Sequence, residues 1–449
     1  MTQPPARTLQ PLRVALVSEH ASPLATMGGV DAGGQNVYVA NVAKGLAALG
    51  HQVEVFTRRD DPTLPAVVDL RPGVRVRHVT AGPAAFVPKE QLLPHMPAFA
   101  AGLERTLRSV ASCDVVHANF FMSGLASLRL KSTMGLPLVT TFHALGLVRR
   151  EHQREADAFP EQRIDIERML VERSDRVIAE CPQDREDLAR LYGASHARMR
   201  MVPCGIDPTE FRPMDKGAAR AELGLDPDEF IVLQLGRLVP RKGVDNVIRS
   251  LGYLTDRRKV RLVIVGGDSR EPDEARTPEI GRLRQVAQDA GVTDRVLFVG
   301  QRRRDELRAY FAAADVFVST PWYEPFGITP LEAMACGTPV IGSAVGGIAY
   351  SVADGVTGFL VPPKDPAALA LRLAQLQAQP ALGQALGLAG VKRVRSMFTW
   401  DHVAAQLAEV YEEVCDPLGA TPLLPARSRP LRLVSSRPLS PRLGVSLVH

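Results

Sequence analysis

A chain of 449 residues that is 45% hydrophobic and 23% charged has the composition of a globular α/β protein and is too long for a single compact core. Its net charge is +5, and residues 417–449 contribute five arginines and no acidic residue. This proline- and serine-rich tail is expected to be disordered and to make at most a weak contact with a membrane surface. Because no aromatic residues interleave the arginines, we expect no nucleic-acid binding.

The sequence also predicts a cytoplasmic location. No apolar run approaches the roughly 18 residues of a membrane span, and residues 1–7 lack the apolar core of a secretory signal. Five cysteines, an odd number without a Cys-x-x-Cys pair, argue for reduced thiols and against a zinc site or a disulfide framework.

Strand and helix patterns alternate along the chain, which is the signature of parallel sheets covered by helices on both faces. The first series opens with a strand at residues 12–17, a glycine-rich loop at 27–34 and a helix at 35–49. Further strands are predicted at residues 51–56, 74–79, 114–117, 138–142, 176–179 and 199–202.

Turn-forming residues at 203–213 predict a linker, after which the pattern restarts. An amphipathic helix at 400–414 is expected to pack back across the domains. The strands of the second series are predicted at residues 230–235, 261–265, 296–299, 316–319 and 340–341. The sequence therefore predicts two doubly wound units, with a ligand in the cleft at the carboxyl ends of their strands.

Residues 319–347 join a strand, a loop, a short helix and the next strand, and they hold the strongest functional signal. Thr329 is predicted as the N-cap, Pro330 as the first helical residue and Glu332 as the third, which completes a Thr-x-x-Glu capping box. The helix N-terminus would then form an anion site. Glu324 on the loop and Glu332 on the helix flank it, and carboxylates beside a phosphate site suit the hydroxyl groups of ribose and sugar.

The loop after the first strand contains two glycine pairs, Gly28-Gly29 and Gly33-Gly34, followed by Asn36. Glycines let the backbone approach a ligand closely and expose amides at a helix start. The spacing is not Gly-x-Gly-x-x-Gly, and no acidic residue ends the second strand, which argues against an NAD-dependent dehydrogenase. The alternative interpretation is a flexible turn without a ligand.

After the first strand of the second series, Arg237 and Lys242 lie in a turn that Gly236 and Gly243 bound. A guanidinium fork and an ammonium charge together suit a diphosphate. The turn lacks the spacing of a P-loop, so two interpretations are open, a phosphate clamp of another kind or a solvated basic turn. The triplet at residues 226–228, Asp-Pro-Asp, precedes a strand, and we interpret it as a turn and not as a metal site.

Four further residues are candidates on position alone. His143 and His117 stand at the carboxyl ends of strands, although a lone histidine is more often structural than catalytic. Lys89 and Arg163 are isolated basic residues, and by pattern alone they would be surface charges.

Together these motifs resemble the retaining glycosyltransferases of the GT-B fold, specifically family 4, which includes sucrose-phosphate synthases, sucrose synthases and inositol-phosphate N-acetylglucosaminyltransferases. The resemblance covers residues 12–415. It rests on Glu324 and Glu332 in a Glu-x7-Glu motif, on Arg237 with Lys242, and on residues 31–36. It implies two Rossmann-like doubly wound parallel-sheet domains that face each other across a cleft.

The resemblance also implies a division of the chain. Residues 1–205 would form the acceptor domain and residues 206–396 the nucleotide-sugar donor domain. Residues 397–416 would form a crossover helix that precedes the disordered tail.

By the same resemblance, Arg237 and Lys242 would hold the donor diphosphate and His143 would contact the donor sugar. Glu324 would face the sugar hydroxyls and Glu332 the ribose hydroxyls. The loop residues expected to line the donor are Gly33, Gly34, Asn36, Phe326, Gly327 and Ile328. The family requires no metal and no cofactor, so a nucleotide sugar, with a UDP-sugar favoured, would be the only co-substrate.

Lys89 and Arg163 match the positions that grip the phosphate of phosphorylated acceptors in this family. Phe120 and Ala144 stand where the inositol-phosphate enzymes have Tyr and Thr, and the loss of both hydroxyls argues against inositol phosphate. We expect a retaining hexosyl transfer to a hydroxyl of a small acceptor, with a sugar phosphate as one candidate. The alternatives are a sugar phosphorylase of the same architecture and a non-catalytic regulator that binds nucleotide sugars.

Overall fold

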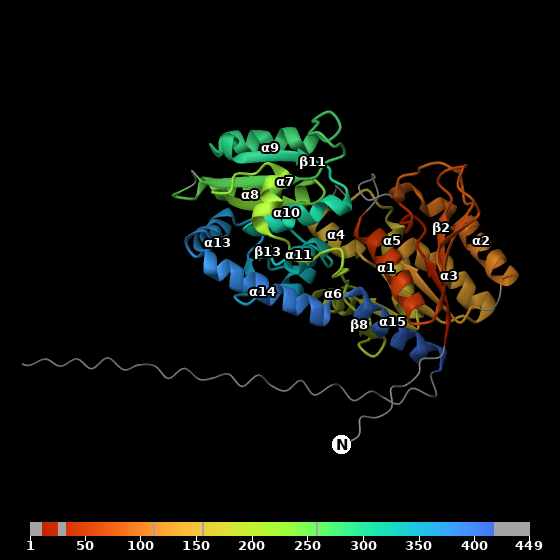
Figure 1. Ribbon diagram of the computed structural model, residues 1–449. Coiled ribbons are helices and arrows are strands. Elements are labelled where there is room, and N and C mark those ends of the chain that lie inside the picture. Colours follow the sequence, from red (N-terminus) through yellow and green to blue (C-terminus); the bar gives the residue numbers. More distant parts are fainter. Residues whose placement is uncertain (1–10, 26–32, 111–112, 155–156, 257–258, 417–449) are drawn as a thin grey trace, which may run out of the picture.

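The computed structural model of the protein describes residues 11–25, 33–110, 113–154, 157–256 and 259–416. Two sheets stand side by side, each between layers of helices, as the alternating pattern predicts (Figure 1). Of the features singled out in the sequence, Gly28, Gly29, Asp31 and the tail at 417–449 lie outside the described residues.

The N-terminal sheet has eight strands in the order β3-β4-β2-β1-β5-β6-β7-β8, and only the β3–β4 pair is antiparallel. Its strands are β1 (Arg13–Val17), β2 (Gln52–Arg58), β3 (Val67–Arg71), β4 (Val74–Val79), β5 (Val115–Asn119), β6 (Leu138–Thr141), β7 (Arg176–Ala179) and β8 (Met199–Met201). Its helices are α1 (Gly34–Ala48), α2 (Met96–Ser109), α3 (Phe121–Met134), α4 (Gly146–Gln153), α5 (Gln162–Arg173) and α6 (Pro182–Tyr192).

The C-terminal sheet has six parallel strands in the order β11-β10-β9-β12-β13-β14. Its strands are β9 (Phe230–Leu235), β10 (Val260–Val265), β11 (Val296–Gly300), β12 (Val316–Ser319), β13 (Val340–Ser343) and β14 (Gly358–Val361). The helices of this half are α7 (Lys216–Leu223), α8 (Val244–Gly252), α9 (Pro278–Asp289), α10 (Leu307–Ala313), α11 (Ile328–Ala335), α12 (Gly346–Ser351), α13 (Pro366–Ala378) and α14 (Pro380–Met397).

Two strands, β3 and β14, are absent from the sequence-based prediction. β3 is an edge strand whose side chains alternate between exposed and half-buried, and it turns into β4 at Gly73, where φ is +82°. Without a covered face it has no apolar run to reveal it. β14 is a four-residue edge strand that begins at Gly358, and a Cβ there would lie 2.1 Å from the carbonyl oxygen of Val340.

In both sheets the strand order reverses beside the first strand of the series, between β1 and β5 and between β9 and β12. Loops that leave these neighbouring strands must run in opposite directions, which opens a crevice at the carboxyl ends of the strands. The two crevices face each other, and the candidate site lies between them.

The chain crosses between the halves twice, and the two crossings are hydrogen-bonded to each other. The amide of Ile206 donates to the carbonyl oxygen of Phe398 at 2.8 Å, and the amide of Trp400 donates back to Ile206 at 3.2 Å. The helix expected at residues 400–414 is α15 (Trp400–Cys415), which lies along α1 of the N-terminal half (Figure 1). Its Tyr411 hydroxyl contacts Nδ1 of His117 at 2.7 Å.

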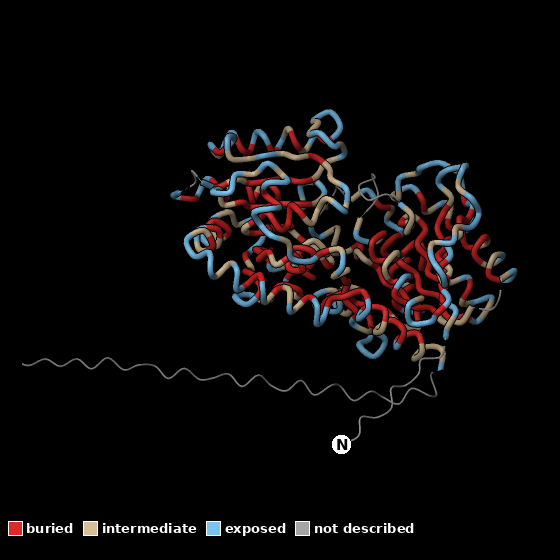
Figure 2. Tube along the Cα trace, in the orientation of Figure 1, coloured by how far each residue is buried: buried red, intermediate tan, exposed pale blue. Residues whose placement is uncertain are grey.

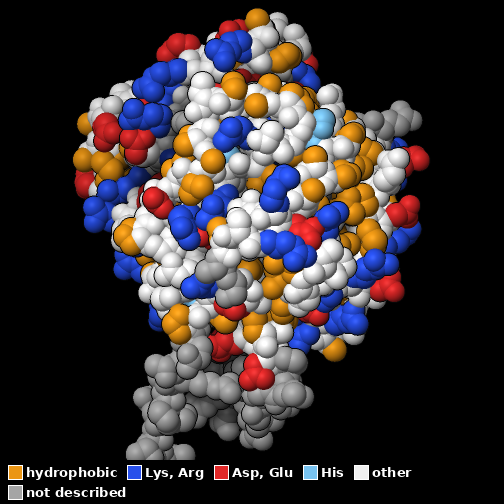
Figure 3. All heavy atoms as spheres, turned by 90° about the vertical axis from the view of Figure 1, so that its right-hand side faces the viewer, with side chains coloured by type: hydrophobic (Ala, Val, Ile, Leu, Met, Phe, Trp, Pro, Cys, Tyr) orange, Lys and Arg blue, Asp and Glu red, His pale blue; other side chains and the backbone are white. Residues whose placement is uncertain are grey.

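Buried residues follow both sheets and the helix faces that cover them (Figure 2). On the outer face of the N-terminal half, basic and acidic side chains are intermixed (Figure 3). Within the described ranges, no helix is both long enough and apolar enough to cross a membrane.

The contact between α1 and α15 predicts the effect of one small substitution. A Cβ at Gly45 would lie 2.6 Å from Cβ of Ala404, so Gly45→Ala should destabilise the protein by about 1–3 kcal/mol by overpacking. The expected destabilisation is opposite in sign to the effect of helix propensity, which favours alanine over glycine by about 1 kcal/mol. The second substitution Ala404→Gly should restore the wild-type stability, measured by urea unfolding. A Gly45→Ala variant that is more stable than the wild type would contradict the predicted overpacking between α1 and α15.

Candidate active site between the two sheets

A cavity of about 410 Å³ lies between the halves, at the carboxyl ends of both sets of strands. Of the candidate site residues that the structure describes, all except Arg163 and His117 line it. The N-terminal half contributes Gly33, Gly34, Asn36, Lys89 and His143, and the C-terminal half contributes Arg237, Lys242, Glu324, Phe326, Gly327, Ile328 and Glu332. The structure therefore brings together residues that are up to about 300 positions apart in the chain.

Two helix N-termini converge on the cavity from opposite walls. α1 begins at Gly34 and α11 at Ile328, and a Cβ on Gly34 would lie 3.6 Å from Cδ1 of Ile328. Their first amides have no partner within the helix, and both dipoles point their positive ends at the cavity. The side chain of Asn36 stabilises this loop. Its Oδ1 accepts a hydrogen bond from the amide of Gly33 at 3.0 Å, and its Nδ2 donates to the carbonyl oxygen of Ser22.

The capping box predicted at the start of α11 is wrong. The helix begins one residue before Thr329, with Gly327 as its N-cap and without a side-chain cap. Gly327 has φ of +87°, which lets the chain turn into the helix early. A Cβ there would also lie 3.2 Å from Cγ of Glu324. Glu332 is therefore the fifth helical residue, and its carboxylate is free of any capping role.

Glu332 accepts a hydrogen bond from Nη1 of Arg304 at 2.8 Å, and its side chain is only 3% exposed. Burial raises the pKa of this carboxyl although Arg304 acts in the opposite direction. Arg304 lies in a 3-10 turn, η6 (Arg304–Glu306), and also lines the cavity. The sequence does not reveal this residue, because it lies within a run of three arginines and no local pattern indicates which of them is buried.

Lys242 and Glu324 form an ion pair on the C-terminal wall. Burial alone would raise the pKa of Glu324, but the charges of Lys242, Arg241 and Arg237 outweigh burial and lower it. Burial lowers the pKa of Lys242. The wall thus holds an ionised carboxylate among three basic side chains, and this excess of positive charge suits a diphosphate.

The turn that carries Lys242 is held against the loop after β12. Gly243 has φ of +66°, and a Cβ there would lie 2.0 Å from the carbonyl oxygen of Thr320. The hydroxyl of Thr320 donates to the carbonyl of Gly243 at 3.1 Å. Only glycine permits this approach, so the sequence Lys-Gly places the ammonium group beside Glu324.

His143 follows β6 and has an unusual backbone conformation for a non-glycine residue, with φ of +58°. Its Nδ1 lies 3.0 Å from Oε1 of Glu180 and its Nε2 lies 3.0 Å from Oδ1 of Asn119. Glu180 and Asn119 were not singled out in the sequence, although both stand at the carboxyl ends of strands. His117, by contrast, is fully buried between Tyr411 and β6, and burial lowers its pKa to about 3, so it is a neutral structural residue.

Arg163 is not the surface charge that its sequence pattern indicates. Its side chain is 0% exposed, and Nε donates to Glu167 at 2.7 Å. The guanidinium lies 5.0 Å from the ring of Phe120 and 4.5 Å from that of Phe159, and both rings line the cavity. Phe120 has φ of +87°, a strained value for a residue with a Cβ. Arg163 therefore supports the cavity wall from behind, whereas Lys89 is in the wall itself.

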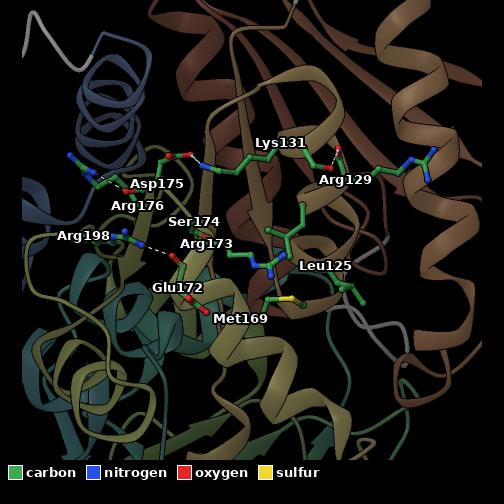
Figure 4. A pocket seen from close by; sticks show the side chains of 12 residues that line it. Leu125, Arg129, Lys131, Met169, Glu172, Arg173, Ser174, Asp175, Arg176 and Arg198 are labelled. Atoms are coloured by element: carbon green, nitrogen blue, oxygen red, sulfur yellow. Dashed lines mark hydrogen bonds and ion pairs between the residues drawn. The ribbon is translucent and has the colours of Figure 1, made fainter.

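A second hollow of about 870 Å³ lies near the C-terminal ends of α3 and α5 and shares no lining residue with the cavity (Figure 4). The last turns of helices favour cations, which accounts for many of its basic side chains. Three of its five basic residues have carboxylate partners: Lys131 with Asp175, Arg129 with Glu104, and Arg176 with Glu413. We assign no ligand to this hollow.

The Asp-Pro-Asp triplet is a turn, as predicted, because the amide of Asp228 donates to the side chain of Asp226 at 2.8 Å. In the part of the chain that the structure describes, no three His, Cys, Asp or Glu side chains cluster in a way that could hold a metal ion.

Comparisons with known proteins agree with this geometry. The family model described as Glycosyltransferase Family 4 matches residues 32–210, and the one described as Glycosyl transferases group 1 matches residues 215–393. D-inositol 3-phosphate glycosyltransferase 2 of Catenulispora acidiphila is 39% identical over 91% of this chain and 97% of its own. A D-inositol 3-phosphate glycosyltransferase of Streptomyces bingchenggensis is 38% identical over 90% of each.

Among solved structures, sucrose-phosphate synthase from Thermosynechococcus elongatus superposes with a TM-score of 0.81 at 36% identity, over 90% of this chain and 98% of that one. Both halves and about nine-tenths of the length are thus shared with known glycosyltransferases. The chain belongs to the family 4 glycosyltransferases of the GT-B fold.

Proposed function

We propose that the enzyme transfers a hexosyl group from a nucleotide sugar, with a UDP-sugar favoured, to a hydroxyl of a small acceptor, with retention of anomeric configuration. The observation that carries this proposal is the single cavity in which Glu324 and Glu332 lie beside Lys242 and Arg237 at the N-terminus of α11.

Departure of the nucleoside diphosphate builds negative charge on its oxygens. Arg237, Lys242 and the first amides of α11 offer positive charge and dipoles that are already in place, which is the most effective form of transition-state stabilisation. The carboxylate of Glu324 would accept hydrogen bonds from the donor sugar. In the described structure it neutralises Lys242, so an incoming diphosphate would compete with it for the ammonium group.

We propose that the acceptor hydroxyl attacks from the face that the diphosphate leaves, and that a phosphate oxygen takes its proton. His143 would orient the donor sugar from the N-terminal wall, since Glu180 and Asn119 fix its ring. In this scheme the basic side chains meet the diphosphate charge, and no metal ion is required.

The acceptor would enter at the N-terminal wall, where Lys89 and Arg149 provide charge and Phe120 and Phe159 provide apolar surface. Relatives that share nearly the full length are named D-inositol 3-phosphate glycosyltransferases. We propose a small acceptor, and a phosphorylated polyol or sugar is the first class to test.

We also propose that the enzyme works in a reducing compartment, the cytoplasm. All five cysteines are free thiols, and burial raises the pKa of Cys181 and Cys336 to about 12. Such thiols are poor nucleophiles, as expected of structural cysteines.

The proposal is tested by the release of UDP, ADP or GDP from a panel of nucleotide sugars, with inositol phosphate, sugar phosphates and free sugars as acceptors. We expect turnover with at least one donor–acceptor pair, an α-linked product from an α-linked donor, and unchanged turnover in the presence of a chelator. Binding of nucleotide without turnover on any acceptor would contradict transfer and favour a regulator. Phosphate-dependent cleavage would favour a phosphorylase.

Substitutions of the two glutamates should have different effects on kcat and on the donor KM. Glu324→Gln should lower kcat about 100-fold because its carboxylate acts on the reacting sugar. It should also cost some stability, because Lys242 loses its ion-pair partner. Glu332→Gln should mainly raise the donor KM, by about tenfold, because ribose binding is lost in the ground and transition states alike. Glu279→Gln, which removes a carboxylate paired with Arg282 on α9, is the control. Losses that only track stability in both site variants would mark the stretch as scaffold.

Substitution of Arg163 tests whether this side chain contacts the acceptor directly or only supports the cavity wall. Arg163→Met should cost about 3–5 kcal/mol of stability, since Glu167 is then buried without its cation. The double variant Arg163→Met/Glu167→Gln should recover part of the loss. We expect that folded double variant to keep its acceptor KM within about threefold of the wild type. A KM that rises more than tenfold in that variant would show direct contact.

A further inference from the structure

Arg304 joins two carboxylates from different parts of the chain at the edge of the donor site. Its Nη1 donates to Oε1 of Glu332 at 2.8 Å, and its Nε lies 2.7 Å from Oε1 of Glu210. The guanidinium lies over the ring of Phe211, 4.7 Å from its centroid. One arginine is therefore shared between a carboxylate in the cavity wall and one in the segment that links β8 to α7.

The two carboxylates depend on Arg304 to different degrees. The Glu332 side chain is 3% exposed, whereas that of Glu210 is 33% exposed and is partly solvated by water. A carboxylate that is buried to this extent needs a counter-charge to remain ionised. Ionisation matters for binding, because a carboxylate accepts hydrogen bonds at both oxygens whereas a carboxylic acid uses one oxygen as a donor.

We propose that Arg304 is a positioning residue of the donor site. It keeps Glu332 ionised and oriented for the ribose hydroxyls, and its second partner, Glu210, weakens this effect. This rests on the proposed binding of a nucleotide donor. The interaction makes donor affinity depend on pH through a residue that does not itself need to touch the ribose.

The charges around Glu332 determine the sign of each effect. Among the described residues, Arg304 and Glu210 act on it through their charges, whereas the nearby Cys336 thiol is neutral because burial raises its pKa to about 12. Burial raises the pKa of Glu332, Arg304 lowers it and Glu210 raises it. Removal of the arginine charge therefore raises the pKa further, and the carboxylate is lost at a higher pH as the pH falls. Removal of the Glu210 charge has the opposite effect.

The experiment is a calorimetric titration between pH 5.5 and pH 9 with whichever of UDP, ADP and GDP binds the wild-type chain best. In Arg304→Gln the pH below which affinity is lost should move upward relative to the wild type, and at pH values below both midpoints a shift of one unit lowers affinity about tenfold. In Glu210→Gln this pH should move downward. The ligand's own phosphate titrates in every sample, and a Glu332→Gln profile records that contribution alone.

Arg303→Ala is the matched control, because this neighbouring arginine is 71% exposed, pairs with Asp305 and does not line the cavity. Its profile should coincide with that of the wild type. Thermal unfolding checks that each variant is folded. If Arg304→Gln does not fold, the downward shift expected in Glu210→Gln decides the inference, and Arg304→Lys, which retains the charge, serves as a comparison. Arg304→Lys should bind more weakly than the wild type with an unchanged midpoint.

Opposite shifts in Arg304→Gln and Glu210→Gln would support the inference. Midpoints that coincide with the wild type in either variant would overturn it and leave the proposed function standing, because a residue that only ties the linker in place would change stability alone. A wild-type chain that binds none of the three nucleotides would overturn the proposed function as well.

Discussion

The ion pair between Lys242 and Glu324 is the interaction on which the rest of the site depends. It exists because β9 and β12 are neighbours in the sheet although about 80 residues separate them, so that the turns after both strands meet at one edge. The contact of Gly243 with Thr320 brings the turns close enough for the side chains to pair. A buried carboxylate offsets one of three basic charges, and the surplus is available to a diphosphate.

The same constraint operates in the N-terminal half, where His143 and its partners Glu180 and Asn119 come from the carboxyl ends of three neighbouring strands. Neither half is a complete site, and the cavity requires that they face each other. The paired crossings at Ile206 and Phe398 connect the halves, and further contacts between them join α6 to α12 and Gln153 to Tyr323. The cavity lies between the halves at the carboxyl ends of both sets of strands, where the proposed donor and acceptor would meet.

Arginines show how the surroundings of a side chain decide its role. Arg163, Arg303 and Arg304 look alike in the sequence, as isolated or clustered basic residues. In the fold, Arg163 is enclosed by aromatic rings and pairs with a buried glutamate, Arg303 lies at the surface, and Arg304 bridges two carboxylates beside the donor site. The first stabilises a wall, the second makes a solvated pair, and the third pairs with a buried carboxylate in the cavity wall.

The sequence by itself determined the two sheets, most of their strands and the family, because period-two and apolar patterns report burial and the Glu-x7-Glu motif is local. Of the candidate site residues that the structure describes, all except Arg163 and His117 line the cavity, and most of those that do follow strand ends or glycine turns. Tertiary structure alone decided the start of α11, where the backbone of Gly327 overrides the capping preference of Thr329. It alone also decided the burial of Arg163 and the bridge at Arg304, because the partners of a long basic side chain come from distant segments that no local pattern records.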